Sequence, residues 1–268
     1  VKKIGFTGIE LVGEPKIYGG SETKRLIKES GLKVGSICGM FPGPDRDDLR
    51  ALCHYEKKER ERAIDYVRAC VDLALEVGAR SVLVVPSLVG KPVFFRSFKE
   101  DWSYAVDSIS KAGAYAKENR IILTIEPINR YEVCLVNSLE DGLQMVKEIK
   151  NDFVQVMGDT FHMQIEEPDG IPDAIRRTGK LFQHLHIADN TRQAPGRGNL
   201  PWREILRALY DINYQGGISL EPLPKGASPY DAREGIIPKE KLDPELNFGL
   251  NYLRKEEEIV LAHLTPKL

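Results

Sequence analysis

Four residues that can hold a metal ion recur along this chain at nearly constant spacing. Each follows a short apolar run, and steps of 33, 27 and 35 residues separate Glu126, Asp159, His186 and Glu221. A (β/α)₈ barrel uses roughly 30 residues per strand–helix unit and places its chemistry at the carboxyl ends of its strands. One such residue at each of four consecutive strand ends would converge on a single metal ion.

The apolar runs themselves favour a parallel α/β arrangement. Seven short runs rich in Val, Ile and Leu end near Leu11, Cys38, Val85, Ile125, Met157, Ile187 and Leu220. Helical patterns lie between them. The clearest spans about Glu56 to Val77 and stops at Gly78, and another opens at Asn137 or Ser138, where the sequence resembles a capping box. Strands that alternate with helices imply a parallel sheet, and seven repeats of roughly 30 to 45 residues favour a barrel over an open sheet. We therefore predict a single TIM-barrel domain over residues 1–268.

Eight strands are expected of such a barrel, whereas seven runs can be identified. The chain opens with VKKIGFTGIEL, which resembles the end of a helix that leads into a strand. We therefore expect the first βα unit to be absent or abbreviated. A barrel without its first strand would leave two strand edges unpaired, so another segment, a partner chain or residues outside this sequence would have to cover them.

Two stretches lack a regular pattern and are rich in Pro, Gly and charge: Gly39 to Arg50 and Glu221 to Pro244. Each follows a predicted strand, on the face where barrel sites lie, and would frame either a substrate or a subunit contact. The segment Pro195–Gly198 lacks the spacing and the lysine of a phosphate-binding loop. It is interpreted as a turn before a helix that begins at Pro201–Trp202.

Composition argues against several classes of partner. The 38 basic and 40 acidic residues give a net charge of −2 without long blocks of either sign, so we expect no nucleic-acid or membrane surface. The four cysteines lack C-x-x-C spacing and predict neither a thiolate metal site nor a disulfide framework. No run reaches the ~20 apolar residues of a membrane span, and the N-terminus lacks the apolar core of a signal peptide. These features predict a cytoplasmic protein that acts on a small molecule.

Three carboxylates and one imidazole form a hard, oxygen-rich ligand set. It suits Mn²⁺, Mg²⁺ or Co²⁺ with open coordination positions better than a closed structural zinc site. Any one of the four could be an ordinary polar residue at a strand end, but the spacing of all four argues for a site.

Further polar residues follow these ligands on the predicted loops. Glu132, His162 and Arg192 would bind a polar ligand beside the metal. Taken alone, Glu132 and Arg192 could each be a solvated loop charge. His184 lies two residues before His186 and therefore shares its side of the strand, where we expect it to be a core residue.

Four segments carry a more specific signature: residues 125–132 (IEPINRYE), 158–167 (GDTFHMQIEE), 184–198 (HLHIADNTRQAPGRG) and 219–222 (SLEP). They resemble the D-tagatose 3-epimerase-like ketose 3-epimerases of the xylose-isomerase-like TIM-barrel superfamily. The resemblance covers roughly residues 5 to 255 and is weaker in the N-terminal third, where the family's first strand contributes apolar wall to the substrate pocket. It implies one divalent ion, usually Mn²⁺, on Glu126, Asp159, His186 and Glu221, with Glu132, His162 and Arg192 at the O1–O2 end of a sugar.

The reaction that the resemblance implies is epimerisation at carbon 3 of a free ketose such as tagatose, psicose, fructose or ribulose. A weakly acidic proton leaves carbon 3 to give a cis-enediolate, and a proton returns to the opposite face, so two bases are needed. Glu126 and Glu221 are the candidate base and acid, because the aspartate ligand is shorter and the histidine ligand must remain a neutral donor. The metal, with hydrogen bonds from Arg192 and His162, would stabilise the negative charge.

Other functions remain to be compared with this one. An aldose–ketose or hydroxypyruvate-type isomerase would use the same enediolate, although Arg192 with Glu132 favours the epimerase. Apurinic-site endonucleases of the same superfamily need about nine metal ligands with many histidines, which five histidines and a net charge of −2 do not supply. A non-catalytic sugar-binding protein would fit the missing first strand but not the intact ligands. The resemblance and the unpaired strand edges predict a homo-oligomer, either a dimer or a tetramer.

Overall fold

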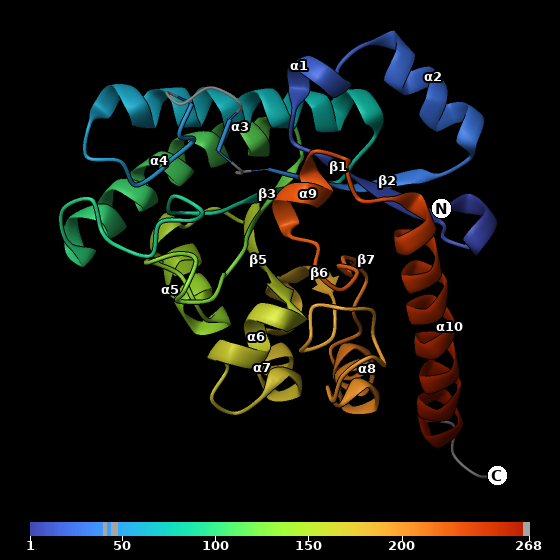
Figure 1. The fold of residues 1–268 in the computed structure, drawn as a ribbon. Helices are drawn as coiled ribbons and strands as arrows, with labels where there is room; N and C mark the ends of the chain where they lie inside the picture. Colours follow the sequence, from blue (N-terminus) through green and yellow to red (C-terminus); the bar gives the residue numbers. More distant parts are fainter. Residues whose placement is uncertain (40–41, 44–47, 265–268) are drawn as a thin grey trace. The chain divides into compact units, whose positions relative to one another are not determined.

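Strands alternate with helices along the whole described chain (Figure 1). The computed structural model describes residues 1–39, 42–43 and 48–264. The chain divides into two compact units, Lys2–Met157 and Gly158–Leu268, the second of which also includes Val1. Each unit is described by itself below, and the single domain expected over residues 1–268 remains a prediction.

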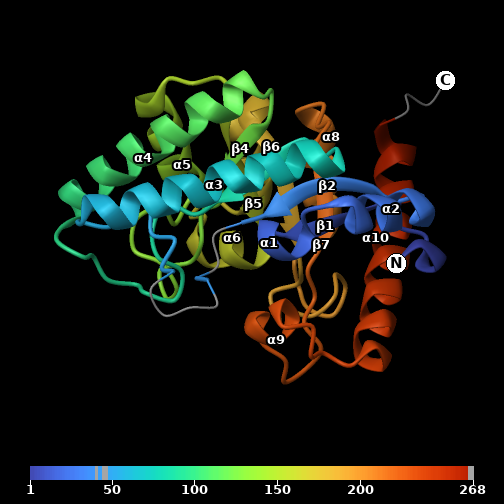
Figure 2. The ribbon, with the colours of Figure 1, turned by 90° about the horizontal axis from the view of Figure 1, so that it is seen from above.

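The unit Lys2–Met157 contains a parallel sheet whose strands follow chain order. Strand β1 pairs with β2, β2 with β3, β3 with β4 and β4 with β5, each in parallel. Helix α3 packs against β2, β3 and α4; α3 and its neighbour α4 are both visible in Figure 2. The elements are η1 Lys2–Ile4, β1 Gly8–Val12, α1 Pro15–Tyr18, α2 Ser21–Ser30, β2 Lys33–Cys38, α3 Lys57–Val77, β3 Ser81–Val84, α4 Phe98–Glu118, β4 Ile122–Ile125, α5 Leu139–Ile149 and β5 Val154–Asp159.

Local sequence signals set the ends of the helices in this unit. Helix α3 ends where Gly78 adopts a left-handed conformation with φ 76°, which glycine reaches without steric cost. Helix α5 begins with the expected capping box, in which the Asp141 backbone N–H donates to Ser138 Oγ and the Ser138 N–H donates to the Asp141 carboxylate. The predicted helices, one from about Glu56 to Val77 and one opening at Asn137 or Ser138, are confirmed, since α3 spans Lys57–Val77 and α5 follows its N-cap Ser138.

The unit Gly158–Leu268 is built around β6 and β7, which pair in parallel with His186 opposite Ser219. Helix α8 packs against α7 and α10, and α10 also contacts β7. The last two residues of β5, Gly158 and Asp159, open this unit. Its other elements are α6 Thr160–Glu166, α7 Ile171–Thr178, η2 Gly179–Leu181, β6 Phe182–Ile187, α8 Trp202–Asp211, β7 Gly217–Leu220, α9 Pro229–Arg233 and α10 Lys239–Leu264.

Seven strands are present among the described residues, and each ends within two residues of its predicted position. The α/β class and the count of seven strands, one fewer than a complete barrel, are thus confirmed. The prediction of an irregular stretch from Glu221 to Pro244 is wrong over Pro229–Arg233, where α9 lies, and from Lys239 on, where α10 begins. Pro244 is the sixth residue of α10 and lies inside the helix, where its missing N–H removes one backbone hydrogen bond. The other irregular stretch, Gly39 to Arg50, lies partly outside the described residues.

No helix in the described part of the chain combines the length and the apolar character that a bilayer crossing requires.

Candidate metal and catalytic site

Asp159 occupies the junction between β5 and α6. Its Oδ1 accepts a hydrogen bond of 2.8 Å from the Phe161 backbone N–H and so caps α6, while its side chain is fully buried. The strand can pass close to its neighbours because residue 158 is glycine, where a Cβ would lie 2.6 Å from the Met163 sulfur. One turn into α6, His162 places Nε2 3.8 Å from Asp159 Oδ2.

His186 lies near the end of β6 and is 3% exposed. The preceding histidine on the same side of the strand, His184, is also buried, with its ring centre 5.2 Å from that of His186. His184 Nε2 lies 3.1 Å from Ser219 Oγ on β7. The prediction that His184 is a core residue is confirmed.

Glu221 follows β7 directly, and its backbone N–H donates to the Ile187 carbonyl at 3.0 Å. This bond continues the pairing of β7 with β6 and brings the Glu221 side chain beside the end of β6. Glu221 Oε2 lies 3.2 Å from His186 Nδ1. Three of the four predicted ligands therefore meet within the unit Gly158–Leu268.

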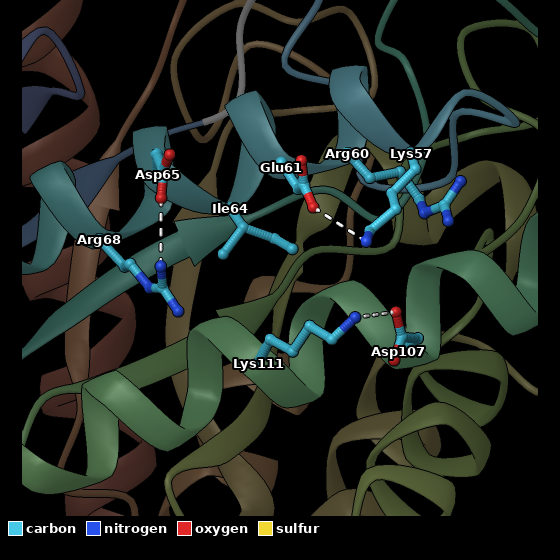
Figure 3. Close-up of a pocket in the computed structure, with 8 residues that line it drawn as sticks. All are labelled: Lys57, Arg60, Glu61, Ile64, Asp65, Arg68, Asp107 and Lys111. Atoms are coloured by element: carbon cyan, nitrogen blue, oxygen red, sulfur yellow. Dashed lines mark hydrogen bonds and ion pairs between the residues drawn. The ribbon is translucent and has the colours of Figure 1, made fainter.

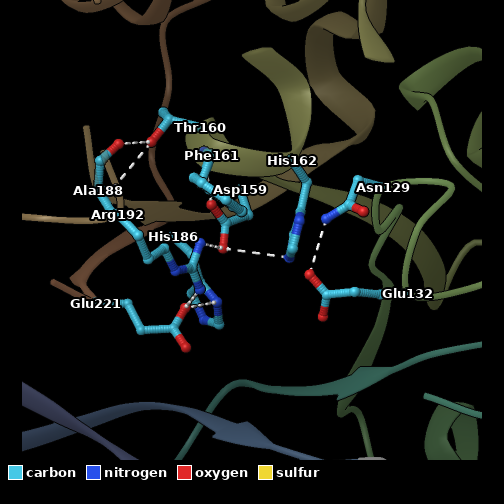
Figure 4. A network of polar contacts seen from close by, with 10 residues as sticks. All are labelled: Asn129, Glu132, Asp159, Thr160, Phe161, His162, His186, Ala188, Arg192 and Glu221. Atoms are coloured by element: carbon cyan, nitrogen blue, oxygen red, sulfur yellow. Dashed lines mark hydrogen bonds and ion pairs between the residues drawn. The ribbon is translucent and has the colours of Figure 1, made fainter. Parts of the chain in front are cut away.

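Arg192 joins the two carboxylates of this cluster (Figure 4). One guanidinium nitrogen donates to Asp159 Oδ2 at 2.6 Å, and the other lies 2.8 Å from Glu221 Oε2. The guanidinium also lies over the Phe161 ring, 5.0 Å from its centre. A planar guanidinium can bridge two carboxylates in this way because its nitrogens diverge in a fixed fork.

The charges of the cluster set its protonation states. Burial by itself would raise the pKa of the Asp159 carboxyl, but Arg192, His162 and His186 outweigh that effect and lower it to about 2. Burial likewise opposes ionisation of Glu221, and the charge of Arg192 together with the hydrogen bond to His186 lowers its pKa. Both acids are therefore carboxylates at neutral pH, the form that a metal ion needs.

The donor set fits a divalent cation. Asp159, His186 and Glu221 each offer one ligand atom, and these three atoms lie within 4.8 Å of one another. Two carboxylates converge here on the positive guanidinium of Arg192, which shows that the position attracts positive charge. Carboxylate oxygens with one imidazole suit Mn²⁺ and ions like it.

The two predicted site residues after β4 belong to the unit Lys2–Met157. Glu126 is buried directly after β4, and its N–H donates to the Val84 carbonyl at 3.0 Å. In the following loop, Asn129 Nδ2 donates to Glu132 Oε1 at 2.8 Å. Asn129 is buried, so this bond fixes the Glu132 carboxylate against the loop.

Sequence reasoning missed two residues that organise the end of β6. Thr160 Oγ1 donates to the Ala188 carbonyl at 2.6 Å and accepts from the Ala188 N–H at 3.0 Å. Asp189 is fully buried and accepts hydrogen bonds from the loop that follows it. A usable signal was present, because an aspartate two residues after a strand and before a Pro-Gly-x-Gly turn is well placed to accept backbone N–H groups.

A separate hollow of about 500 Å³ lies between α3 and α4 in the unit Lys2–Met157 (Figure 3). Its charged lining is largely paired, with Lys57 beside Glu61, Arg68 beside Asp65 and Lys111 beside Asp107. Exposed pairs of this kind contribute little binding energy of their own. The candidate site is therefore the carboxylate cluster rather than this hollow.

Sequence comparison places the cluster in the context of known proteins. The family described as xylose isomerase-like TIM barrel matches residues 1–240. A D-psicose 3-epimerase from Enterocloster bolteae is 43% identical over 229 residues, which are 83% of this chain and 74% of that protein. A 3-dehydro-D-guloside 4-epimerase from Escherichia coli is 30% identical over 239 residues, which are 87% of this chain and 88% of that protein.

Solved structures agree with the sequence comparison. A D-psicose 3-epimerase from Clostridium cellulolyticum, determined with D-tagatose, aligns with a TM-score of 0.82 and 27% identity over 95% of this chain and 90% of that chain. The 3-keto-D-glucoside 4-epimerase from E. coli, in its apo form, aligns with a TM-score of 0.79 and 28% identity over 95% of this chain and 91% of that chain.

Proposed function

Because the chain belongs to the xylose isomerase-like TIM-barrel family, we propose that it is a divalent-metal-dependent enzyme that epimerises free ketoses at carbon 3. The observation that carries this proposal is the convergence of Asp159, His186 and Glu221 around one point, with Arg192 across the two carboxylates. The relatives that share most of the chain are named as epimerases of sugars. These relatives support the reaction class, and the cluster supports the use of a metal ion.

Each ligand has a separate task in this proposal. Asp159 and His186 hold the metal, Glu221 is a third ligand, and the sequence motif adds Glu126 as a fourth. When bound, the ion stabilises negative charge that develops on the substrate oxygens. Glu126 and Glu221 move the proton at carbon 3 from opposite faces, because inversion requires that one carboxylate removes it and the other returns it.

The polar residues around the ligands orient the sugar. Glu132, His162 and Arg192 bind the O1–O2 end in this proposal, so that carbon 3 faces the two glutamates. Arg192 is suited to the task because its donors already point at the carboxylate cluster. Each donor that approaches a substrate oxygen also stabilises the enediolate formed after proton removal.

Four finer points complete the proposal. The physiological ion is Mn²⁺, for which the hard, mixed oxygen and nitrogen donor set is suitable. The whole chain forms one barrel domain, acts in the cytoplasm and assembles as a homo-oligomer. Light scattering at several concentrations tests the last point, and a monomer at all concentrations would contradict it.

Turnover in D₂O tests the reaction directly. Protein stripped with EDTA and reloaded with Mn²⁺ is incubated with psicose, fructose, tagatose and ribulose, and the products are separated by chromatography. We expect an inverted ketose with deuterium at carbon 3, and no product before metal is restored. Deuterium at carbon 1 or 2 in an aldose would indicate an isomerase, and metal and sugar binding without exchange would indicate a binding protein.

A 4-epimerase of 3-keto sugars is a second candidate. The E. coli relative named for that reaction matches 88% of its own length, a larger share than the psicose epimerase does. The chemistry is related, because the proton that is removed is again next to a ketone. A 3-keto glycoside added to the same assay separates the two, since it would gain deuterium at carbon 4.

A further inference from the structure

We infer that Asp189 is a positioning residue that sets the place of the Arg192 guanidinium and, through it, of Asp159 and Glu221. The inference rests on the proposed function for its catalytic consequences, but its structural core stands on hydrogen bonds within the unit Gly158–Leu268. It also explains the Pro195–Gly198 turn, which the proposed reaction leaves without a role.

The Asp189 carboxylate is the centre of the loop that follows β6. It is fully buried, and each of its oxygens accepts two hydrogen bonds. Oδ1 receives the backbone N–H groups of Asn190 and Leu200 at 2.9 and 3.2 Å. Oδ2 receives the Gly196 N–H at 2.8 Å and the Trp202 indole N–H at 3.0 Å. The loop therefore folds around one carboxylate.

The glycines of this loop allow that close approach. A Cβ at Gly198 would lie 2.3 Å from Asp189 Oδ1 and 2.0 Å from Asn190 Oδ1. Gly196 has φ +88°, and a Cβ there would lie 2.7 Å from the Tyr252 ring. The two glycines of the Pro-Gly-x-Gly turn are thus needed for the backbone to wrap the carboxylate.

Asp189 also fixes the backbone of Arg192. The Arg192 N–H donates to the Asp189 carbonyl at 2.8 Å, and the Asp189 N–H donates to the Gln193 carbonyl at 2.8 Å. Within this closed turn Arg192 has φ +59°, a left-handed conformation that a non-glycine residue keeps only where its surroundings impose it.

Arg192 passes this order on to the ligands. Its guanidinium contacts Asp159 at 2.6 Å and Glu221 at 2.8 Å, and its carbonyl accepts the Leu223 N–H at 2.7 Å. The side chain thus holds both carboxylates, and the backbone holds the chain two residues beyond Glu221. A shift of the Arg192 backbone would move all three contacts together.

Asp189→Asn is the sharpest test, because it keeps the size of the side chain. The amide turns one acceptor oxygen into a donor that faces two N–H groups, so the loop must open. We expect Mn²⁺, measured by titration calorimetry, to bind at least ~10-fold more weakly, as is typical when a residue that supports a metal ligand is changed. The ketose KM should rise and kcat should fall in the metal-saturated protein.

A double-mutant cycle with Arg192→Gln separates positioning from mere stabilisation. If Asp189 acts through Arg192, the double variant binds Mn²⁺ as weakly as Arg192→Gln alone, and the two changes are not additive. Additive losses, or Asp189→Asn protein that is less stable but keeps wild-type Mn²⁺ affinity, KM and kcat, would overturn the inference. Because the cycle is read by metal binding, a failure of the proposed reaction remains distinguishable from a failure of this inference.

Two milder variants guard against misfolding. Trp202→Phe removes a single donor from Asp189 Oδ2 and keeps a smaller aromatic ring, so we expect a smaller change in the same direction. Asn190→Ala is the matched control, because it removes a bond to the Asn199 N–H in the same loop but leaves the Asp189 carboxylate in place. We expect the Mn²⁺ affinity of Asn190→Ala to stay within about twofold of wild type. If Asn190→Ala lost as much Mn²⁺ affinity as Asp189→Asn, the specific role of Asp189 would be contradicted.

Discussion

Strands β6 and β7 pair in register but hold their site residues in different ways. Five of the six residues of β6 are buried, and the loop beyond it folds around the Asp189 carboxylate. None of the four residues of β7 is buried, and Ile218 is 44% exposed. In the loop beyond β7, by contrast, the side chains of Ser228 and Asp231 each accept the other's backbone N–H, three residues apart in the sequence.

The comparison shows where the position of Glu221 comes from. Its own strand offers little packing, and its side chain remains 34% exposed. It is fixed instead from the β6 side, by His186, by the guanidinium of Arg192 and by the Ile187 carbonyl. Glu221 is thus less enclosed than Asp159 and His186, the two other proposed ligands of this unit.

The largest expected effect is that of Glu221→Gln. The amide cannot accept the proton at carbon 3 and loses the charge that pairs with Arg192, so kcat should fall by ~10²- to 10⁴-fold. Steady-state turnover of the metal-saturated variant measures the loss, and we expect kcat of Glu126→Gln to fall by a similar factor. Glu234→Gln, an exposed change in the loop after β7, is the control. Near-normal turnover by either site variant with metal bound would exclude the two-base scheme.

Arg192→Lys tests the link from β6 to β7. Lysine keeps the charge but cannot reach Asp159 and Glu221 at once with a rigid fork. The loss of one charged hydrogen bond corresponds to about 1.5–3 kcal/mol, so kcat/KM should fall by roughly 10- to 100-fold. Arg177→Lys, which changes a partly exposed ion pair with Asp169, should have little effect. If the two variants behave alike, Glu221 does not depend on Arg192.

The pKa of Asp159 predicts how the stability of metal-free protein depends on pH. Since folding lowers this pKa from 3.8 to about 2, the ionised carboxylate stabilises the fold above pH 3.8, and that contribution disappears as the pH falls toward 2. Its size is on the order of 2 kcal/mol. In urea unfolding between pH 4 and 2, the free energy of unfolding should therefore fall less steeply with decreasing pH for Asp159→Asn than for wild type. Asp173→Asn is the exposed control. If the pH slope of Asp159→Asn equals that of wild type or that of Asp173→Asn, ion pairing at Asp159 does not stabilise the fold.

The sequence predicted the positions of the ligands better than the contacts among them. Asp159, His186 and Glu221 could be placed because an apolar run followed by a polar residue identifies a strand end, which is a local property. The bridge made by Arg192 depends on a left-handed backbone at φ +59° that no local pattern specifies. For Asp189 the turn after it was a local signal that it accepts backbone N–H groups, but an aspartate is by default a surface residue, and its full burial follows from how a whole loop closes.

The terminal helix illustrates the same limit. Pro, Gly and charge between Glu221 and Pro244 predicted an irregular chain, yet α10 starts at Lys239. Tertiary packing outweighs the local signal. Gly249 allows α10 to pack closely, because a Cβ at residue 249 would lie only 3.0 Å from Pro195 and 3.2 Å from Leu220. Contacts between segments far apart in sequence are not encoded in the periodicity of either one.

The smallest effect is expected from Ser219→Ala, which acts on β7 without touching a proposed ligand. Ser219 Oγ is the partner of the buried His184 Nε2 at 3.1 Å, so its loss should cost about 1 kcal/mol in urea unfolding and leave KM and kcat near wild type. Ser103→Ala, on the exposed side of α4, should cost less than about 0.5 kcal/mol. A tenfold loss of kcat at unchanged stability would instead make His184 part of the site. If only stability changes, β7 serves to hold Glu221 against β6, and the chemistry depends on the groups that Arg192 joins.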